Sequence, residues 1–526
     1  MAEQKRCHIG FIFNREEVVM NNNGMNQRKI GVMLSYLTLA FNILVGLIYT
    51  PFMISRLGDG QYGIYSLANS LISFVTLLDL GFGQTLVRYI SKERAAGNKD
   101  AEYRLNGLFL KIYLTIAIVA IFVGMCIITI YPQLVVNTFT HDEVDLFRIV
   151  FSILLVNVTI SFPLSVFSAT LNAYEKFFAL KLANFLISIC KYLMMFLLLL
   201  FGYKLISITV VTFISSLCMQ GFYVIYAIKK IEIKFNFSKI EINLKKEILG
   251  FSFFIFLNLI IDFLYSNTDK LILGVVAGTV SVSVYSIGIY FSQYFTELSC
   301  AMSGVFLPKI VNYYENGKSS EISDLFNKVG RLQMILLFLV LGGYICLGKE
   351  FINLWVGTTY NDSYLIGIII MLPSIVPLTQ NIGISVIRAM NIHKYRSYMY
   401  IVIALLNVAI SIPLAIAYGG IGTAIGTGIS TVVGQIIFMN WFYYKKVNID
   451  IKLYWKNFIK FTFVTLLVVI AIYIFKLVIV PTNWIEFFFL VMLFTGVYMT
   501  IYWFFLANTY EKKLVKSLIV KRSQKS

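Results

Sequence analysis

The amino-acid sequence predicts an all-α integral membrane protein with about fourteen transmembrane helices. Hydrophobic residues make up 59% of the chain and charged residues only 13%, whereas charged residues are about a quarter of an ordinary globular domain. Apolar runs long enough to cross a bilayer follow one another almost end to end. Lysine and arginine gather in alternate connections between these runs. The bilayer is therefore the expected solvent, and we expect no sizeable soluble domain.

Windows of about 19 residues locate the helices in order along the chain. The predicted spans are 30–54, 62–84, 107–131, 146–170, 179–202, 205–228, 247–275, 282–307, 328–348, 363–387, 397–417, 420–444, 457–480 and 484–507. The predicted parts are an N-terminal segment (1–29), a first lobe of six helices (30–228), a basic linker (229–246), a second lobe of six helices (247–444), two further helices (457–507) and a basic tail (508–526).

Most of the 44 Lys and Arg residues fall on the side that holds both termini. The positive-inside rule therefore predicts that both termini are cytoplasmic. Residues 1–29 lack an apolar core, so we expect the first span to direct insertion without a cleaved signal peptide. The net charge of +18 is spread between apolar runs and forms no continuous basic face, which argues against nucleic-acid binding.

No cofactor or metal site is predicted. The six cysteines are scattered, mostly inside apolar runs, without the paired spacing of a disulfide framework or a zinc site. The three histidines, His8, His141 and His393, lie in separate loops.

The two lobes carry traces of an internal repeat. A shift of 220 residues superimposes identical residues in the two lobes: Gly58 on Gly278, Tyr65 on Tyr285, Ser66 on Ser286, Thr76 on Thr296 and Ile90 on Ile310. The segment 226–230 (YAIKK) resembles 442–446 (FYYKK) at a shift of 216. An even number of spans per repeat gives like-oriented lobes, related by a pseudo-two-fold axis along the membrane normal around a central cavity. The alternative is chance resemblance between apolar helices.

Ionisable residues inside the spans mark candidate functional positions, because each costs about 2.5 to 3.5 kcal/mol near the bilayer centre. Asn258, Asp262, Ser266 and Asp269 follow helical spacing on one face of the seventh span, and the repeat aligns Asp262 with Asn42. We expect this face to line a polar cavity.

Further polar residues lie in other spans. Gln293 and Glu297 are four residues apart in the eighth span, and Lys191 is central in the fifth. Asp79 follows Asn69 near the cytoplasmic end of the second.

The functional hypothesis divides these residues by chemistry. The cations and amides are predicted to contact an anionic substrate: Lys191, Lys270, Asn42, Asn69, Asn258 and Gln293. The carboxylates are predicted to accept a coupling H⁺ or Na⁺, or to act in gating: Asp262, Glu297, Asp269 and Asp79. The alternative is that these charges form salt bridges between helices.

Two glycine patterns have structural interpretations. Gly422 and Gly426, in the segment GIGTAIGTG, are predicted to permit close helix packing, since no soluble strand precedes them as a dinucleotide loop requires. Gly81 and Gly83 are predicted to loosen the second helix near its end.

Four segments carry a family resemblance: Pro51–Leu67, Asp79–Tyr89, Asp269–Gly274 and Phe306–Lys309. They resemble the Wzx-type polysaccharide flippases, whose superfamily also contains lipid II flippases and multidrug extruders. The resemblance covers nearly the whole chain and implies transport of undecaprenyl-diphosphate-linked O-antigen or capsule units across a bacterial inner membrane. It implies no exact site residues beyond those above.

Two alternatives remain open at this point. A multidrug or small-solute exporter of the same fold would differ only in substrate. A membrane-embedded sugar polymerase or ligase would need a sizeable outer loop to hold acceptor and catalytic groups, and the longest one, 131–145, is short. The sequence therefore favours a transporter without catalytic residues over an enzyme.

Overall fold

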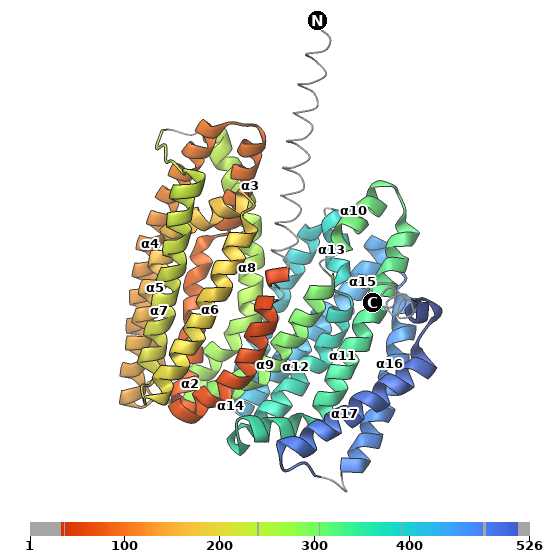
Figure 1. Ribbon diagram of the computed structural model, residues 1–526. Helices are drawn as coiled ribbons and strands as arrows, with labels where there is room; N and C mark the ends of the chain where they lie inside the picture. Colours follow the sequence, from red (N-terminus) through yellow and green to blue (C-terminus); the bar gives the residue numbers. More distant parts are fainter. Residues whose placement is uncertain are drawn as a thin grey trace, which may run out of the picture. The chain divides into compact units, whose positions relative to one another are not determined.

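The computed structural model shows a helical protein whose elements follow the order in Figure 1. It describes residues 33–35, 37–238, 241–303, 306–390, 392–476 and 480–513. The predicted N-terminal segment 1–29 lies outside the described residues, as does most of the predicted tail. The described residues contain helices and turns but no strands.

Twelve helical segments within the described residues are long and apolar enough to cross a membrane. The predicted number of about fourteen differs from this for two reasons. Helix α9 (Gly278–Ser303) is not among the twelve, and one long segment, Tyr398–Val447, covers two predicted spans. That segment is broken at Gly419, where φ is 57° and ψ is −133°, between the predicted spans 397–417 and 420–444.

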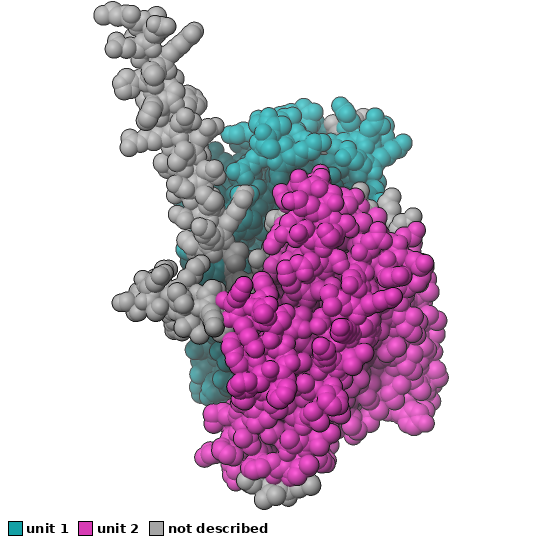
Figure 2. Space-filling view, turned by 90° about the vertical axis from the view of Figure 1, so that its right-hand side faces the viewer, with its two compact units in different colours: residues 1–280 teal, residues 281–526 magenta. Residues whose placement is uncertain are grey.

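The chain divides into two compact units, Met1–Val280 and Ser281–Ser526, coloured separately in Figure 2. Unit 1 contains the first helix (Met33–Leu57), α2 (Asp59–Thr76), η1 (Leu77–Asp79), α3 (Phe82–Ala95), α4 (Lys99–Leu134), α5 (His141–Ala173), α6 (Phe177–Leu200), α7 (Leu205–Tyr226), η2 (Ala227–Ile231) and α8 (Ile242–Val276). Helix α8 packs on α2 and α3 within this unit. The predicted lobe boundaries, 30–228 and 247–444, stay a prediction.

Unit 2 begins inside α9 and contains the remaining helices. These are α10 (Leu307–Glu315), α11 (Ser319–Trp355), η4 (Thr358–Tyr360), α12 (Asn361–Thr379), α13 (Ile382–Ala389), α14 (His393–Thr431), η5 (Val432–Phe438), α15 (Met439–Phe442), η6 (Tyr443–Val447), α16 (Ile451–Lys476), α17 (Trp484–Ile501) and η7 (Tyr502–Leu506). Helices α16 and α17 both pack on α11. The last two helices are thereby assigned a place in unit 2.

The second helix breaks where the sequence indicates, between η1 and α3. Leu80 and Gly81 both adopt left-handed conformations, with φ of 50° and 76°. A Cβ on Gly81 would lie 2.5 Å from Cγ2 of Ile255 on α8, so the break also brings the backbone close to that helix. The predicted loosening at this position is confirmed.

The backbone repeats its turns at the shift found in the sequence. Gly58 and Gly278 precede the body of α2 and α9 with φ of 82° and 81°. Gly97 and Gly317, 220 residues apart, precede α4 and α11 with φ of 71° and 66°. The two lysine-rich segments both form π-helical turns, η2 and η6, and each is followed by a residue with φ of 57°. Matched backbone conformations strengthen the case for an internal repeat.

Gly422 and Gly426 allow close packing, as predicted. A Cβ on Gly422 would lie 1.9 Å from the Leu414 carbonyl oxygen, and one on Gly426 would lie 2.4 Å from Oγ of Ser411. Both contacts join the two parts of α14 on either side of Gly419. Any larger residue must separate these parts.

We expect Gly422→Ala to destabilise the protein by about 1 to 3 kcal/mol, because the new methyl group overlaps a backbone carbonyl. The matched control is Gly496→Ala in α17, where a Cβ meets nothing within 4 Å. That change should be neutral or stabilising by up to about 1 kcal/mol, since alanine favours helix. Thermal unfolding in detergent compares the two variants. Equal melting temperatures would contradict the close approach at Gly422.

Candidate functional site

Lys191 lies inside unit 1, on α6. Its side chain is half-buried, and its Nζ atom lies 4.5 Å from the centre of the Tyr192 ring. Within the described part of the chain, no ion pair joins Lys191 to a carboxylate. A cation at this depth without a counter-charge is costly, and the aromatic face offsets only part of that cost.

Three tyrosines, here called the tyrosine cluster (Tyr49, Tyr65 and Tyr192), surround the same region. The Tyr49 and Tyr192 rings are 5.7 Å apart, and Tyr65 is close enough to interact electrostatically with both. Tyr49 is 9% exposed, and its hydroxyl has no hydrogen-bond partner among the described residues. A buried hydroxyl of this kind is available to a ligand.

Asn69 and Thr212 extend this polar region. The Tyr65 hydroxyl interacts with both side chains, while Nδ2 of Asn69 donates to the Tyr65 carbonyl at 2.7 Å. Residues of the first helix, α2 and α7 therefore lie with Tyr192 and Lys191 of α6 in one region. Asn42, predicted as a cavity residue, lies on the first helix and is exposed.

Aromatic packing holds the first helix against α6. Phe41 contacts Phe185 edge to face with ring centres 5.5 Å apart, and Phe52 contacts Phe196 at 4.5 Å. Pairs in these geometries contribute about 0.5 to 1.5 kcal/mol each beyond area burial. They fix the register that brings Tyr49 beside Tyr192.

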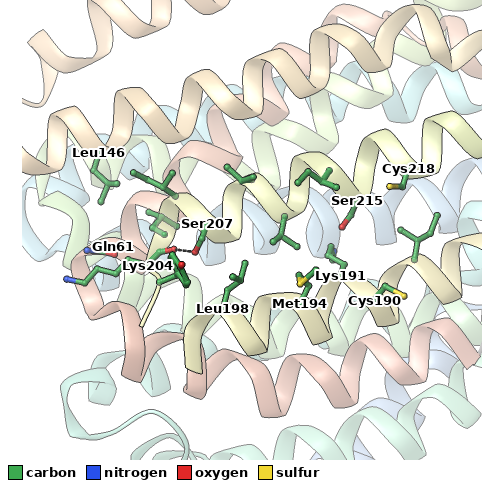
Figure 3. A pocket seen from close by; sticks show the side chains of 17 residues that line it. Gln61, Leu146, Cys190, Lys191, Met194, Leu198, Lys204, Ser207, Ser215 and Cys218 are labelled. Atoms are coloured by element: carbon green, nitrogen blue, oxygen red, sulfur yellow. Dashed lines mark hydrogen bonds between the residues drawn. The ribbon is translucent and has the colours of Figure 1, made fainter. Parts of the chain in front are cut away.

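An open groove lies between α6 and α7 on unit 1, with a volume of about 890 Å³. Figure 3 shows Gln61 and Lys204 at one end of this groove and Cys190 and Cys218 at the other. We call it the α6–α7 groove, and it is lined by Gln61, Leu146, Ile187, Cys190, Lys191, Met194, Leu198, Tyr203, Lys204, Leu205, Ile206, Ser207, Val210, Val211, Ile214, Ser215 and Cys218. The lining is mostly apolar.

The predicted face of α8 is only partly exposed. Asn258, Asp262 and Ser266 are exposed, whereas Asp269 is 5% exposed and packs inside unit 1. Lys270 is half-buried, and within the described residues no ion pair joins it to a carboxylate. The one-face arrangement follows from helical spacing, but burial differs along it. The end of α8 that holds Asp269 packs closely on its neighbours, since a Cβ on Gly274 would meet Tyr131 of α4 and Leu67 of α2.

Asp79 lies at the break in the second helix. Its Oδ1 atom accepts a hydrogen bond from the Tyr113 hydroxyl at 2.7 Å, and its Oδ2 atom accepts from the Gly83 N–H at 3.5 Å. The carboxylate therefore accepts one backbone N–H in the first turn of α3, which has no partner within the helix. These two hydrogen bonds give Asp79 a structural role in addition to the predicted role in ion coupling or gating.

Gln293 and Glu297 lie on α9 in unit 2, and both are exposed. The predicted residues thus fall into two sets, one in each unit. A nearby buried network holds α9 in place: Ser299 donates to the Leu378 carbonyl at 2.6 Å, and Gln333 donates to the Ser299 carbonyl at 3.1 Å.

Sequence reasoning missed the tyrosine cluster. A tyrosine hydroxyl inside an apolar span is a polar group that the sequence displays. The chain holds 33 tyrosines, however, and sequence position alone does not distinguish the three cluster residues from the others. No group of three or more His, Cys, Asp or Glu residues suited to a metal occurs among the residues described. The arrangement around Lys191 offers a cation, hydroxyls and an amide, which suit an anionic or hydroxyl-rich ligand.

Solved structures share the fold. A lipid II flippase MurJ in an inward closed conformation has 18% sequence identity and a TM-score of 0.70, with 89% of this chain and 97% of that chain covered. An inward-facing multidrug resistance MATE family transporter of the MOP superfamily has 13% identity and a TM-score of 0.64, covering 76% and 93%. A Vibrio cholerae MATE transporter, VcmN, in a mutant form has 15% identity and a TM-score of 0.53, covering 80% and 99%.

These neighbours are flippases and transporters rather than enzymes. No curated protein sequence matches the chain. The sequence model of the polysaccharide biosynthesis protein family matches residues 30–314, which is more than half of the chain. The chain therefore belongs to the polysaccharide biosynthesis protein family and is a multi-pass membrane protein with the flippase and transporter fold of MurJ and MATE proteins.

Proposed function

We propose that this protein is a flippase that moves undecaprenyl-diphosphate-linked oligosaccharide repeat units across the bacterial inner membrane. The product is a surface polysaccharide, either O-antigen or capsule. The observation that carries this proposal is Lys191, a cation inside a membrane-spanning unit, beside the tyrosine cluster and without a described carboxylate partner. Membership in a polysaccharide biosynthesis family supports the substrate class.

The proposal accounts for the free-energy cost of placing Lys191 and Lys270 inside the membrane. A lysine near the bilayer centre costs about 2.5 to 3.5 kcal/mol, which an anionic ligand recovers by direct pairing. A diphosphate supplies that anion for Lys191 and Lys270. Tyrosine hydroxyls and amides such as Asn69 supply partners for sugar hydroxyls.

Alternating access couples transport to an ion gradient in this proposal. Asp262 and Glu297 are exposed carboxylates within helices, and they are the proposed contacts for H⁺ or Na⁺. Both termini lie in the cytoplasm, and the lobes 30–228 and 247–444 alternate between inward and outward access.

The multidrug MATE neighbour favours a second candidate, a same-fold exporter of drugs or small solutes. Fold alone does not separate it from a flippase. The two candidates differ in one readout, because only the flippase is required for surface glycan. A sugar polymerase or ligase stays less favoured, for want of an outer loop to hold an acceptor.

A deletion strain tests the proposal. We expect deletion to remove surface polysaccharide, and Lys270→Ala and Glu297→Gln each to lower rescue about tenfold or more while membrane insertion is kept. Matched controls are Lys181→Ala on α6 and Glu241→Gln before α8, both exposed, which should rescue fully. Surface glycan is measured by immunoblot against protein amount in the membrane.

Two outcomes would count against the proposal in different ways. Full rescue by both Lys270→Ala and Glu297→Gln would remove these residues from the mechanism. Normal surface glycan in the deletion strain, with no second exporter present, would overturn the flippase assignment and leave the small-solute exporter as the better candidate.

A further inference from the structure

The α6–α7 groove is open and apolar along its middle. Met194 and Ile214 are each 52% exposed, and Leu198, Val210 and Val211 lie between its ends. Exposed apolar side chains on membrane-spanning helices face hydrocarbon, because a water-filled path would expose polar groups instead. The groove is therefore shaped to hold a hydrocarbon chain.

Two lysines, Lys191 and Lys204, line the groove. Lys204 lies in the connection between α6 and α7, and Lys191 lies nine residues before the end of α6, about 14 Å away along the helix axis. The predicted topology puts Lys204 at the outer surface of the membrane and Lys191 at mid-depth. A cation at the surface end and hydrocarbon below it match the profile of an anionic lipid.

A hydrogen bond to its backbone carbonyl fixes the position of Lys204. Its carbonyl accepts a hydrogen bond from the Ser207 hydroxyl at 2.6 Å, which fixes the turn that begins α7. Its side chain is exposed, and no described carboxylate pairs with it. Figure 3 shows the Lys204 side chain beside Gln61 at the groove end. The amine is thus free to meet a phosphate at the membrane surface.

We propose that the α6–α7 groove is the release path for the lipid carrier: it holds the polyprenyl chain of the lipid diphosphate while the diphosphate passes from Lys191 to Lys204. This inference rests on the proposed function, because that function supplies a polyprenyl diphosphate. The two lysines favour a diphosphate lipid over a zwitterionic one, and Lys191 belongs both to the groove lining and to the proposed substrate site.

Photolabelling of the purified full chain tests the groove. The probe is a polyprenyl diphosphate with a diazirine on its chain, used in phosphatidylcholine nanodiscs, and labelled peptides are mapped by mass spectrometry. We expect the α6 and α7 peptides to carry about fivefold more label than the exposed apolar face of α4 around Ile118 and Phe122.

Two variants locate the contacts. Lys204→Gln should lower labelling about fivefold, the effect of one lysine on an anionic headgroup at a membrane surface. Lys181→Gln, an exposed lysine elsewhere on α6, is the matched control and should change nothing. Ile214→Trp should block the groove, whereas Ile118→Trp on α4 should not. Size-exclusion profiles show whether each variant folds. If Ile214→Trp does not fold, Lys204→Gln alone decides the result.

Other outcomes overturn the inference. Equal labelling of α4 and the groove, or no loss with Lys204→Gln, would show that the groove holds no preferred lipid. Equal groove labelling by a photoactivatable phosphatidylglycerol would show a general anionic-lipid site instead of a release path. A deletion strain with normal glycan would overturn only the flippase assignment, and groove labelling by purified protein would stand apart from it.

Discussion

Replacing Arg331 with alanine is expected to cost about 3 to 5 kcal/mol of stability, because it leaves a buried carboxylate without its counter-charge. Nε of Arg331 donates to Oε1 of Glu511 at 2.7 Å, and Nη2 donates to Oε2 at 3.0 Å. The two side chains are only 11% and 4% exposed. A fork-to-fork pair with this burial is strong while intact and costly when one side is removed.

The same guanidinium joins three segments of unit 2. Nη1 donates to Oδ1 of Asn457 on α16 at 2.8 Å, and Nη2 also donates to the Leu506 carbonyl at the end of η7, likewise at 2.8 Å. At the other end of α11, Lys476 pairs with Glu350 at 2.7 Å. At that same end Phe351 of α11 contacts Phe487 of α17 with ring centres 5.6 Å apart. The last two helices are therefore held on α11 at both ends and are expected to move with it as one body.

Thermal unfolding in detergent measures the effect. The matched control is Lys328→Ala, one turn away on α11, whose exposed pair with Asp324 should contribute no more than about 0.5 kcal/mol. Equal melting of Arg331→Ala and Lys328→Ala would contradict a stabilising role for the buried pair. A second control uses Glu511→Gln, which removes the charge and keeps the shape.

The pH dependence of stability shows whether the contact between Arg331 and Glu511 stabilises the protein. Burial alone would raise its pKa, but hydrogen bonds from Arg331 and the Asn508 N–H outweigh burial and hold the pKa below its usual value. A lowered pKa adds stability above the unfolded value and loses it as pH falls through the folded value. The difference in stability between the native chain and Glu511→Gln should therefore shrink as the pH falls below the ordinary glutamate pKa of about 4.3.

The fold class follows from the sequence because lipid leaves the backbone few choices. An apolar run must satisfy its own hydrogen bonds, so each such run becomes a helix. Turn positions are also readable: Gly58 and Gly278 need positive φ, which glycine adopts without steric cost. The properties of neighbouring residues determine these helices and turns, so both can be predicted from the sequence.

Long-range partners are not readable in the same way. The predicted span beginning at 328 places Arg331 near the membrane surface, whereas α11 begins at Ser319 and buries it. Its partner Glu511 lies 180 residues later, with no spacing that connects them. The tyrosine cluster could not be predicted for the same reason, since Tyr49, Tyr65 and Tyr192 meet only through helix packing. The depth of Lys191 was predictable, but its neighbours were not.

Replacing Lys191 with methionine is expected to lower rescue of surface polysaccharide about tenfold to a hundredfold, the effect of losing one charged contact to substrate. Lys191→Arg keeps the charge and should retain more activity. The matched control is Lys181→Met on the same helix, which is exposed and should rescue fully. Accumulation of lipid-linked oligosaccharide on the cytoplasmic side, measured beside surface glycan, places the block at transport.

Stability separates a substrate contact from a structural one at this position. If Lys191 held the bundle together, Lys191→Met would lower the melting temperature and the amount of protein in the membrane together with rescue. If it binds substrate, removing a half-buried cation relieves a cost of about 2.5 to 3.5 kcal/mol, so stability should hold or rise while transport falls. Opposite movement of the two readouts is therefore expected, and parallel loss would return Lys191 to a purely structural role.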